Sequence, residues 1–252
     1  LWGMFHVEHH LLSIVCFRVK IAYITTRKET TMTYTHLLFD LDGTITKSEE
    51  GIFNCMKYAM DWAGIPYPAP EVFRSFIGPS LYDSFSNTLH MDDAQAKEMV
   101  AKYRERYNVI GLFEAEVYDG VAETLEKLKK SGCILSVATS KPTEPTLRIL
   151  EKFGVRKYFD VVVGSNPDGT GSDKKFIITH VLESLKKDHG LTEEMVMSGQ
   201  AAMIGDRRYD IEGGKACGLQ TIGVLYGYGS REEFEIAGAD HIVEKPQEIL
   251  NL

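Results

Sequence analysis

Four short polar segments carry residue types from which a catalytic site could be built. The first is the run Asp40-Leu41-Asp42-Gly43-Thr44, which follows the apolar residues Leu37-Leu38-Phe39 of a predicted buried strand. Because side chains alternate along extended backbone, Asp40 and Asp42 are expected to point the same way. Paired carboxylates suit a hard divalent cation, and one of them is free to act as a nucleophile. An ordinary Asp-Gly turn would explain the same residues, so the interpretation depends on partners further along the chain.

The other three segments follow predicted strands or begin a predicted helix. They are Thr139-Ser140-Lys141, the pair Lys174-Lys175, and Gly205-Asp206 with Asp210 four residues later. In an open parallel sheet the carboxyl ends of the strands form the edge where ligands bind. Each segment alone has an ordinary explanation as a helix cap, a solvated pair or a turn. Together they predict a cation site beside a phosphate site.

The pattern of the remaining chain predicts an α/β protein with a doubly wound parallel sheet. Strands are expected over 37–39, 133–138, 161–163, 201–204, 220–225 and 241–243, and helices over 120–130, 146–153, 176–187 and 210–217. Strands alternating with helices of this length indicate βαβ units with both faces of the sheet covered. Residues 48–115 interrupt the alternation with helical patterns alone, over 49–63, 71–76, 81–89 and 94–107. We expect this helical insertion to form a small separate domain, with residues 32–47 and 116–252 as the core.

Composition narrows the class of protein. The chain has 252 residues, of which 44% are hydrophobic and 25% charged, as is ordinary for globular proteins. A formal net charge of -8 gives no sign of a nucleic-acid or anionic-membrane partner, so a phosphate site must be locally positive. The four cysteines lie far apart without a CxxC pair, which favours reduced thiols in a cytoplasmic protein. No apolar run approaches the roughly 20 residues that a membrane span needs.

Residues 1–31 are predicted to be an extension outside the folded domain. They contain a short apolar stretch over 11–17, but no Lys or Arg precedes it, which argues against a secretory signal. Met32 stands just before the strand that leads to Asp40. The alternative is an additional strand or helix docked on the domain.

The four segments together resemble the four motifs of the haloacid dehalogenase superfamily of phosphohydrolases. They read Asp40-Leu41-Asp42-Gly43-Thr44, Val137-Ala138-Thr139-Ser140-Lys141-Pro142, Lys174, and Gly205-Asp206-Arg207-Arg208-Tyr209-Asp210. The resemblance runs from residue 33 to the end of the chain, and the second Asp of the first motif favours the phosphatase branch. The helical insertion is similar to the cap of subfamily I. The runs Phe76-Ile77-Gly78-Pro79 and Gly223-Val224-Leu225-Tyr226-Gly227-Tyr228-Gly229 are similar to the phosphoglycolate phosphatase group.

The resemblance implies Mg²⁺-dependent hydrolysis of a small phosphomonoester. Asp40 would be the nucleophile that forms an aspartyl-phosphate, and Asp42 would protonate the leaving alcohol and then activate water. Mg²⁺ would be held by Asp40, the backbone carbonyl of Asp42 and Asp206.

Further residues receive roles from the same resemblance. Thr139, Ser140 and Lys174 would bind the phosphoryl group, with Lys175 as the fallback for Lys174; related proteins often carry Asn where this chain has Ser140. Thr44 would support the site, and Asp210 would either lie in the outer shell of the metal or orient Lys174. Arg74 is a possible contact for the far end of the substrate, the alternative being a solvated helix charge.

Several alternatives stay open at this point. The same fold and residues suit a 5′-nucleotidase or a sugar-phosphate mutase, and a phosphorylated aspartate could also serve as a switch without enzymatic turnover. The expected partner is a small phosphorylated metabolite, with no nucleic acid and no membrane, and either a monomer or a homodimer.

Overall fold

A computed structural model describes residues 34–252, so the expectation for residues 1–31 lies outside the described part of the chain. Six parallel strands form one sheet in the order β5-β4-β1-β6-β7-β8. The strands are β1 (His36–Phe39), β4 (Ile134–Pro142), β5 (Val161–Ser165), β6 (Ala201–Gly205), β7 (Gln220–Val224) and β8 (His241–Val243). Phe39 lies level with Val137 of β4 and Ile204 of β6. The residues that follow these three strands therefore emerge side by side at one edge.

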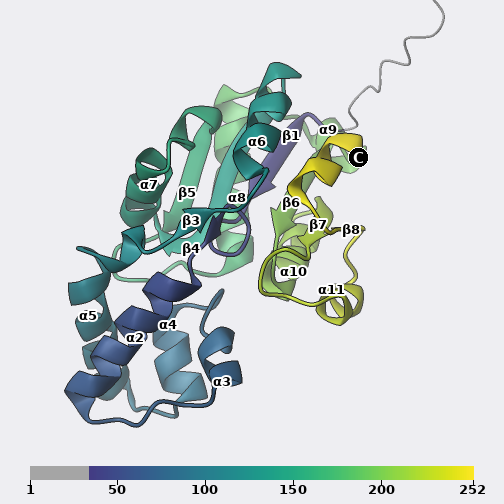
Figure 1. Ribbon diagram of the computed structural model, residues 1–252. Helices are drawn as coiled ribbons and strands as arrows, with labels where there is room; N and C mark the ends of the chain where they lie inside the picture. The colour runs from purple at the N-terminus through teal and green to yellow at the C-terminus, as the bar shows by residue number, and fades with distance from the viewer. Residues whose placement is uncertain (1–33) are drawn as a thin grey trace, which may run out of the picture. The chain divides into compact units, whose positions relative to one another are not determined.

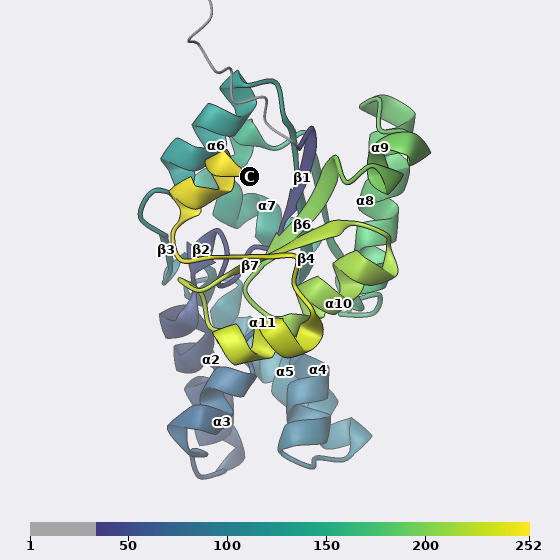
Figure 2. The same cartoon turned by 90° about the vertical axis from the view of Figure 1, so that its right-hand side faces the viewer.

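Helices cover both faces of this sheet, as Figures 1 and 2 show. On one face lie α6 (Val121–Lys130) and α7 (Thr143–Lys152), and on the other α8 (Lys174–Asp188), α9 (Glu193–Met197) and α10 (Arg208–Ala216). The alternation of strand side chains separates the two cores, since Leu38 packs with the α8 face while Leu37 and Phe39 pack with the other. Helix α11 (Arg231–Ala237) packs against α10. The prediction of a doubly wound α/β fold is confirmed.

The segment between Lys47 and Glu116 is mainly helical and lies beyond the carboxyl ends of the strands (Figure 1). It contains α2 (Glu49–Ala63), α3 (Pro70–Ser75), α4 (Leu81–Asp83) with a π-helical turn (Ser84–Thr88), and α5 (Asp93–Tyr107). The chain leaves and re-enters the sheet region through two short antiparallel strands, β2 (Thr46–Lys47) and β3 (Glu116–Val117). The two connections of the helical segment are therefore joined to each other.

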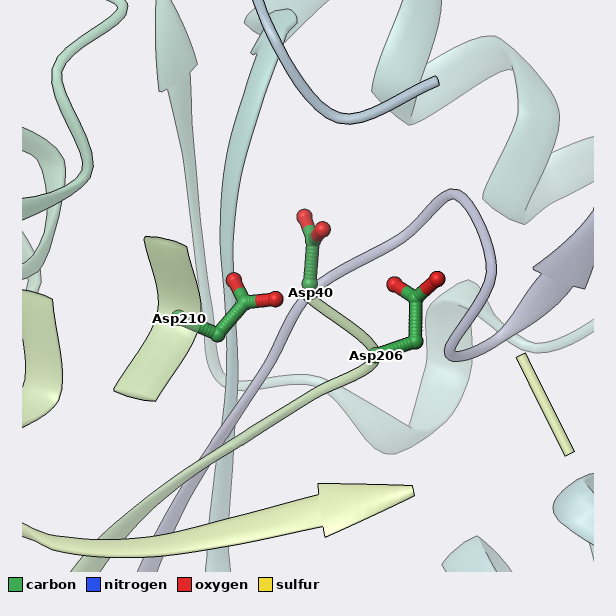
Figure 3. Close-up of side chains that lie close together, drawn as sticks. All are labelled: Asp40, Asp206 and Asp210. Atoms are coloured by element: carbon green, nitrogen blue, oxygen red, sulfur yellow. The ribbon is translucent and has the colours of Figure 1, made fainter. Parts of the chain in front are cut away.

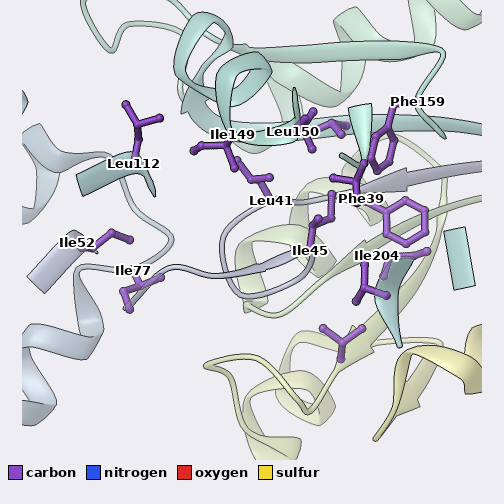
Figure 4. Close-up of a cluster of buried hydrophobic side chains, with 14 of the residues drawn as sticks. Phe39, Leu41, Ile45, Ile52, Ile77, Leu112, Ile149, Leu150, Phe159 and Ile204 are labelled. Atoms are coloured by element: carbon purple, nitrogen blue, oxygen red, sulfur yellow. The ribbon is translucent and has the colours of Figure 1, made fainter. Parts of the chain in front are cut away.

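Apolar side chains link the helical segment to the sheet. In Figure 4, Phe39, Leu41 and Ile45 of β1 and its following turn lie near Ile149 and Leu150 of α7. Ile52, Ile77 and Leu112 of the helical segment belong to the same cluster of buried residues. Burial of this kind contributes about 25 cal/mol per Å² of apolar surface, so it stabilises the helical segment against the sheet.

The structure adds elements that the sequence patterns did not predict: α9, α11 and the short strands β2 and β3. Strand β4 continues through Pro142, and α7 begins at Thr143 rather than 146, because a proline such as Pro145 is tolerated in the first turn of a helix. Cys55, Cys133 and Cys217 are free thiols. Within residues 34–252, no helix has the length and apolar character needed to cross a membrane.

Candidate active site

The turn after β1 brings two carboxylates to the edge of the sheet. Asp40 is 5% exposed and lies directly after the strand, and Gly43 follows with a φ of +82°. A Cβ at Gly43 would lie 2.1 Å from Oδ2 of Asp206, which follows β6. Only glycine combines this backbone conformation with so close an approach. The glycine of the first motif thus allows the Asp40 turn and Asp206 to meet.

Three carboxylates form a buried acidic cluster at this edge. One oxygen each of Asp40, Asp206 and Asp210 lies within 4.8 Å of the others, and Figure 3 shows the three side chains side by side. Burial, together with the charges of Asp210 and Asp40, raises the pKa of Asp206 well above its usual value. Asp206 accepts hydrogen bonds from the Thr44 hydroxyl (3.3 Å) and the Tyr228 backbone N–H (2.9 Å). Both donors are neutral, and no lysine or arginine among residues 34–252 forms an ion pair with Asp206.

Lys174 compensates part of this negative charge from the first turn of α8. Its Nζ lies 3.0 Å from Oδ1 of Asp40 and 2.7 Å from Oδ1 of Asp210, and it donates to the carbonyl oxygen of Ala138 (3.1 Å). Burial disfavours its charge, but the two carboxylates outweigh that effect and raise the pKa of Lys174 above its usual value. The neighbouring Lys175 is exposed. Of the two candidate lysines, the structure therefore brings Lys174 to the acidic cluster.

A second buried lysine pairs with the other carboxylate of the first motif. Lys141 Nζ lies 2.7 Å from Oδ2 of Asp42, and it also donates to the hydroxyl of Tyr107 at 2.7 Å. The side chains of Lys141 and Asp42 are only 9% and 14% exposed. Asp42 and Tyr107 outweigh burial and raise the pKa of Lys141, whereas burial raises that of Tyr107 to about 12. Lys141 is therefore an ammonium and Tyr107 a neutral phenol.

A cavity of about 100 Å³ lies between the sheet edge and the helical segment. Its walls include Asp40, Asp42, Thr139 and Ser140 at the sheet edge, and Tyr103, Arg104 and Tyr107 of α5. A second hollow of about 570 Å³ shares Ser140 and residues 78–80 with it and is also lined by Lys174. The nucleophile candidate, the phosphate-site candidates and the helical segment thus surround one space.

The remaining predicted residues differ in their placement. Thr139 is buried, and its hydroxyl accepts from the Lys141 backbone N–H (3.3 Å). Ser140 directs its hydroxyl to the Ser172 carbonyl (2.8 Å). Arg74 does not join the cavity: its side chain is 70% exposed, and it pairs with Glu49. For Arg74, the geometry matches the alternative of a solvated helix charge.

Lys141, Tyr107 and Arg104 are among the cavity residues that had no predicted role. Lys141 was noted after its strand but was not assigned, and Tyr107 and Arg104 were not noted at all. Arg104 lines the cavity and is half-buried, and its guanidinium has no hydrogen bond or ion pair to any residue of the described chain. The available signal was the spacing of Arg104, Tyr107 and Asn108, which places all three on one face of a helix. It does not show which face meets the sheet edge.

The chain is similar to known proteins in both sequence and structure. Residues 37–224 match the family model described as haloacid dehalogenase-like hydrolase. The chain is 39% identical over 214 residues to a 5′-nucleotidase of Pseudomonas aeruginosa, covering 85% of this chain and 93% of the relative. It is 33% identical over 193 residues to tyrosine-protein kinase PtkA of Mycobacterium tuberculosis, covering 77% of this chain and 62% of the relative. The crystal structure of a predicted phosphatase from Clostridium acetobutylicum superposes with a TM-score of 0.79 at 40% identity, covering 87% and 99% of the two chains.

Proposed function

Because the chain belongs to the haloacid dehalogenase-like hydrolase family, we propose that it hydrolyses a small phosphomonoester through a phosphorylated Asp40, with Mg²⁺ as its cofactor. The recognition of the family and the prediction of an enzyme are confirmed. The phosphoryl chemistry, the metal and the substrate belong to the proposal.

The observation that carries the proposal is the position of Asp40. Its carboxylate is buried at the end of β1, beside Lys174, and it lines a cavity together with the hydroxyl-bearing residues Thr139 and Ser140. A nucleophile for phosphorus needs this combination of an anionic oxygen and nearby donors for the phosphoryl oxygens. The sheet edge places all of them without help from the helical segment.

The residues present fit a divalent cation. Four carboxylates meet at this edge (Asp40, Asp42, Asp206 and Asp210), and two lysine ammonium groups lie among them. When these carboxylates and ammonium groups are all ionised, two negative charges stay unbalanced, and one Mg²⁺ would neutralise them. Asp40, Asp206 and the backbone carbonyl of Asp42 would hold the ion, since oxygen donors are the ligands that Mg²⁺ prefers. Bound there, it supplies positive charge that offsets the repulsion between an anionic nucleophile and an anionic phosphate.

Each protein side chain then has a definite task. An oxygen of Asp40 forms a bond to phosphorus while the bond from phosphorus to the alcohol oxygen breaks, and Asp42, which enters this step in its protonated form, gives that oxygen its proton. Water next attacks the phosphorus and loses a proton to Asp42, so phosphate leaves and Asp40 is restored. Lys174 and Thr139 bind phosphoryl oxygens, and Asp210 orients Lys174 through their 2.7 Å contact.

The division into core and cap is part of the same proposal. Residues 32–47 and 116–252 would form the catalytic core and residues 48–115 a cap that covers the cavity. The antiparallel pairing of β2 with β3 supports this, because it joins the two connections at one place where a cap can hinge. We also propose a cytoplasmic location, supported by the three free thiols of the described chain.

Two substrate classes have specific support. A cavity of about 100 Å³ holds roughly three water volumes, which favours a substrate as small as phosphoglycolate in this arrangement. A 5′-nucleotide is the second candidate, because the Pseudomonas aeruginosa relative is named for that activity and the neighbouring 570 Å³ hollow is of ordinary ligand size. Such a substrate would reach Asp40 with its base in the larger hollow.

The test is release of inorganic phosphate from a panel of phosphate esters that contains phosphoglycolate, 5′-nucleotides and hexose phosphates, with Mg²⁺ or with excess EDTA. We expect release that depends on Mg²⁺ and is abolished by Asp40→Asn. Isomerised sugar phosphate without free phosphate would indicate a mutase, and a long-lived phosphorylated wild type would indicate a switch. A tyrosine peptide is included as an acceptor because of the kinase relative. Activity retained in Asp40→Asn contradicts the mechanism.

A further inference from the structure

We propose that Lys141 is a positioning residue for Asp42, and that Tyr107 of α5 holds Lys141 in the position where it does so. Proton transfer to the leaving alcohol then depends on where α5 lies, whereas the nucleophile does not. The inference rests on the proposed function, because it concerns how Asp42 acts in that reaction.

The contacts form a short chain from the helical segment to the first motif. The Tyr107 hydroxyl accepts from Lys141 Nζ, and the same Nζ lies against Oδ2 of Asp42, both at 2.7 Å. The ammonium also stands 4.7 Å from the centroid of the Tyr107 ring, within the range of a cation–π interaction. Lys141 is thus fixed from two sides, one of which belongs to α5.

The two oxygens of Asp42 have different surroundings. Oδ2 faces Lys141, whereas Oδ1 is buried and has no hydrogen-bond partner within residues 34–252. A buried carboxylate oxygen without a donor is costly, so it marks a place that a ligand proton can occupy. Since Asp42 lines the cavity together with Asp40, the geometry makes Oδ1 the oxygen that handles the proton. Lys141 would hold the carboxylate through the other oxygen.

Tyr107 is itself well fixed on α5. Its ring stacks on that of Tyr103, one turn earlier, with a centroid distance of 5.1 Å and an interplanar angle of 22°. Both tyrosines are buried and line the cavity. Within the described chain, the Tyr103 side chain has no hydrogen bond to Lys141, whereas the Tyr107 hydroxyl accepts one from it. A movement of α5 away from the sheet edge would remove the Tyr107 contact and free the Lys141 side chain.

Lys141 could instead bind a phosphoryl oxygen directly, because it is a cation at the same cavity. The two roles differ in how they depend on the leaving group. A residue that positions the general acid matters for an alcohol that must be protonated as it leaves, and little for a phenolate that leaves without a proton. A residue that binds the phosphoryl group matters equally for both.

The experiment compares benzyl phosphate with 4-nitrophenyl phosphate in the full chain with Mg²⁺. Each ester has one ring and one phosphate, but only the benzyl alcohol needs a proton to leave. The readout is the ratio of the two kcat/KM values, because kcat/KM covers the steps up to release of the alcohol and omits hydrolysis of the phosphorylated Asp40. Asp42→Ala serves as the reference for loss of the acid.

We expect Lys141→Met to lower kcat/KM for benzyl phosphate about 100-fold and that for 4-nitrophenyl phosphate less than about 5-fold, following the usual size of general acid catalysis. Tyr107→Phe, which keeps the ring and all charges, should shift the ratio in the same direction by about 5-fold, as expected for loss of one hydrogen bond. Tyr103→Phe is the matched control and should leave the ratio at the wild-type value.

Equal losses on both esters in Lys141→Met would overturn the proposal in favour of direct phosphoryl binding. An unchanged ratio of the two kcat/KM values in Tyr107→Phe would overturn the dependence on α5. Tyr107→Phe tests this dependence even if thermal unfolding shows that Lys141→Met does not fold. In the Asp42→Ala background, Lys141→Met should not shift the ratio further, and a further shift would also contradict the proposal. Wild-type protein that turns over neither ester would contradict the proposed function itself.

Discussion

The two buried lysines of the site differ in where their partners come from. Lys174 contacts Asp40, Asp210 and the Ala138 carbonyl, all of which belong to the sheet edge or to α10 beside it. Lys141 contacts Asp42 at the sheet edge but Tyr107 on α5. The Lys174 group is therefore complete without the helical segment, and the Lys141 group is not. The proposed nucleophile Asp40 thus has its support at the sheet edge, whereas Asp42, the carboxylate proposed to handle the proton, shares its support with α5.

This division suits a hydrolase that must accept a substrate and still exclude unwanted reactions. A nucleophile needs a fixed environment at all times, because stabilising donors act best when no reorganisation is needed during the reaction. Proton transfer to the leaving group is useful only once the substrate is enclosed. Dependence of Lys141 on α5 would tie that step to enclosure.

The largest effect is expected from a substitution that removes the contacts of Lys174 with Asp40 and Asp210. Lys174→Met removes the cation beside Asp40, and we expect kcat/KM for 4-nitrophenyl phosphate to fall about 1000-fold, as for loss of a strong electrostatic contact in the transition state. Steady-state kinetics on 4-nitrophenyl phosphate measures this, because that ester needs little help from Asp42. The effect should therefore appear on the ester that Lys141→Met leaves nearly unchanged.

Lys175→Met is the matched control for that experiment. Lys175 is the next residue in the chain and carries the same charge, but it is exposed and has no contact with the acidic cluster. We expect its kcat/KM for 4-nitrophenyl phosphate to stay within about 2-fold of wild type, since exposed charges contribute little. A loss in Lys175→Met as large as in Lys174→Met would show that the wrong lysine has been assigned.

The second prediction concerns pH and Mg²⁺, and it also belongs to the Lys174 side. Burial raises the pKa of Asp206 and Asp210 above the unfolded value. The metal-free native state thus binds more protons than the unfolded state once the pH exceeds about 4. As the pH rises from there through the raised pKa values of the folded state, these two groups lower the free energy of unfolding. Mg²⁺ competes with those protons, and it should raise Tm more at pH 8 than at pH 5. Thermal unfolding with and without Mg²⁺ at both pH values measures the difference.

Variants separate the two sides of the site in this experiment. Asp206→Asn removes a buried charge and a metal ligand, so its Tm should no longer respond to Mg²⁺ at either pH. A ligand at about 100 times its Kd stabilises by roughly 2.7 kcal/mol, which is the size of effect to be lost. Lys141→Met should retain the Mg²⁺ response, because the proposed ligand from Asp42 is its backbone carbonyl. An equal Mg²⁺ response at pH 5 and pH 8 would contradict the assignment of the acidic cluster.

The sheet side of the site was largely predictable from sequence, and the reason is geometric. Asp40 and Asp206 each follow a short apolar strand, Thr139 follows the apolar part of β4, and the ends of parallel strands meet at one edge. The sequence favoured Lys174 over Lys175 as the phosphate lysine, and the structure places Lys174 beside Asp40, because α8 begins at that residue and turns its side chain inward. Local pattern and fold class together were enough.

The helical side was not predictable in the same way. Arg74 was singled out from its charge and its position in the insertion, yet α3 turns it to solvent, where it pairs with Glu49. Tyr107 and Arg104 lie on α5, whose polar residues are spread so widely that its sequence does not show which face meets the sheet. That face is set by packing between α2, α5 and the sheet edge, which no local pattern records. The helical pattern predicted over 81–89 did not show that Ser84–Thr88 forms a π-helical turn.

The smallest effect is expected from a substitution at Arg104, which tests whether the helical segment contributes to the choice of substrate. The Arg104 guanidinium has no hydrogen bond or ion pair in the described chain and the residue lines the cavity, so this side chain is available to a second anionic group on the substrate. We expect Arg104→Ala to raise KM for phosphoglycolate about 10-fold, the size of one charge-assisted hydrogen bond, and to leave KM for benzyl phosphate within about 2-fold. Steady-state kinetics on the two esters measures the difference.

Arg74→Ala is the control for that prediction, because it removes the same charge from the same helical segment but outside the cavity. Its KM for phosphoglycolate should stay near the wild-type value, since an exposed ion pair such as that with Glu49 contributes little. If Arg104→Ala raises KM equally for both esters, the residue shapes the cavity and does not recognise a second anion. If only Arg74→Ala raises KM for phosphoglycolate, the helical segment contacts the substrate through a different face from the one that now meets the sheet edge. The helical segment would then have to rotate on the sheet edge when substrate binds, and the contact between Tyr107 and Lys141 would not describe the substrate-bound protein.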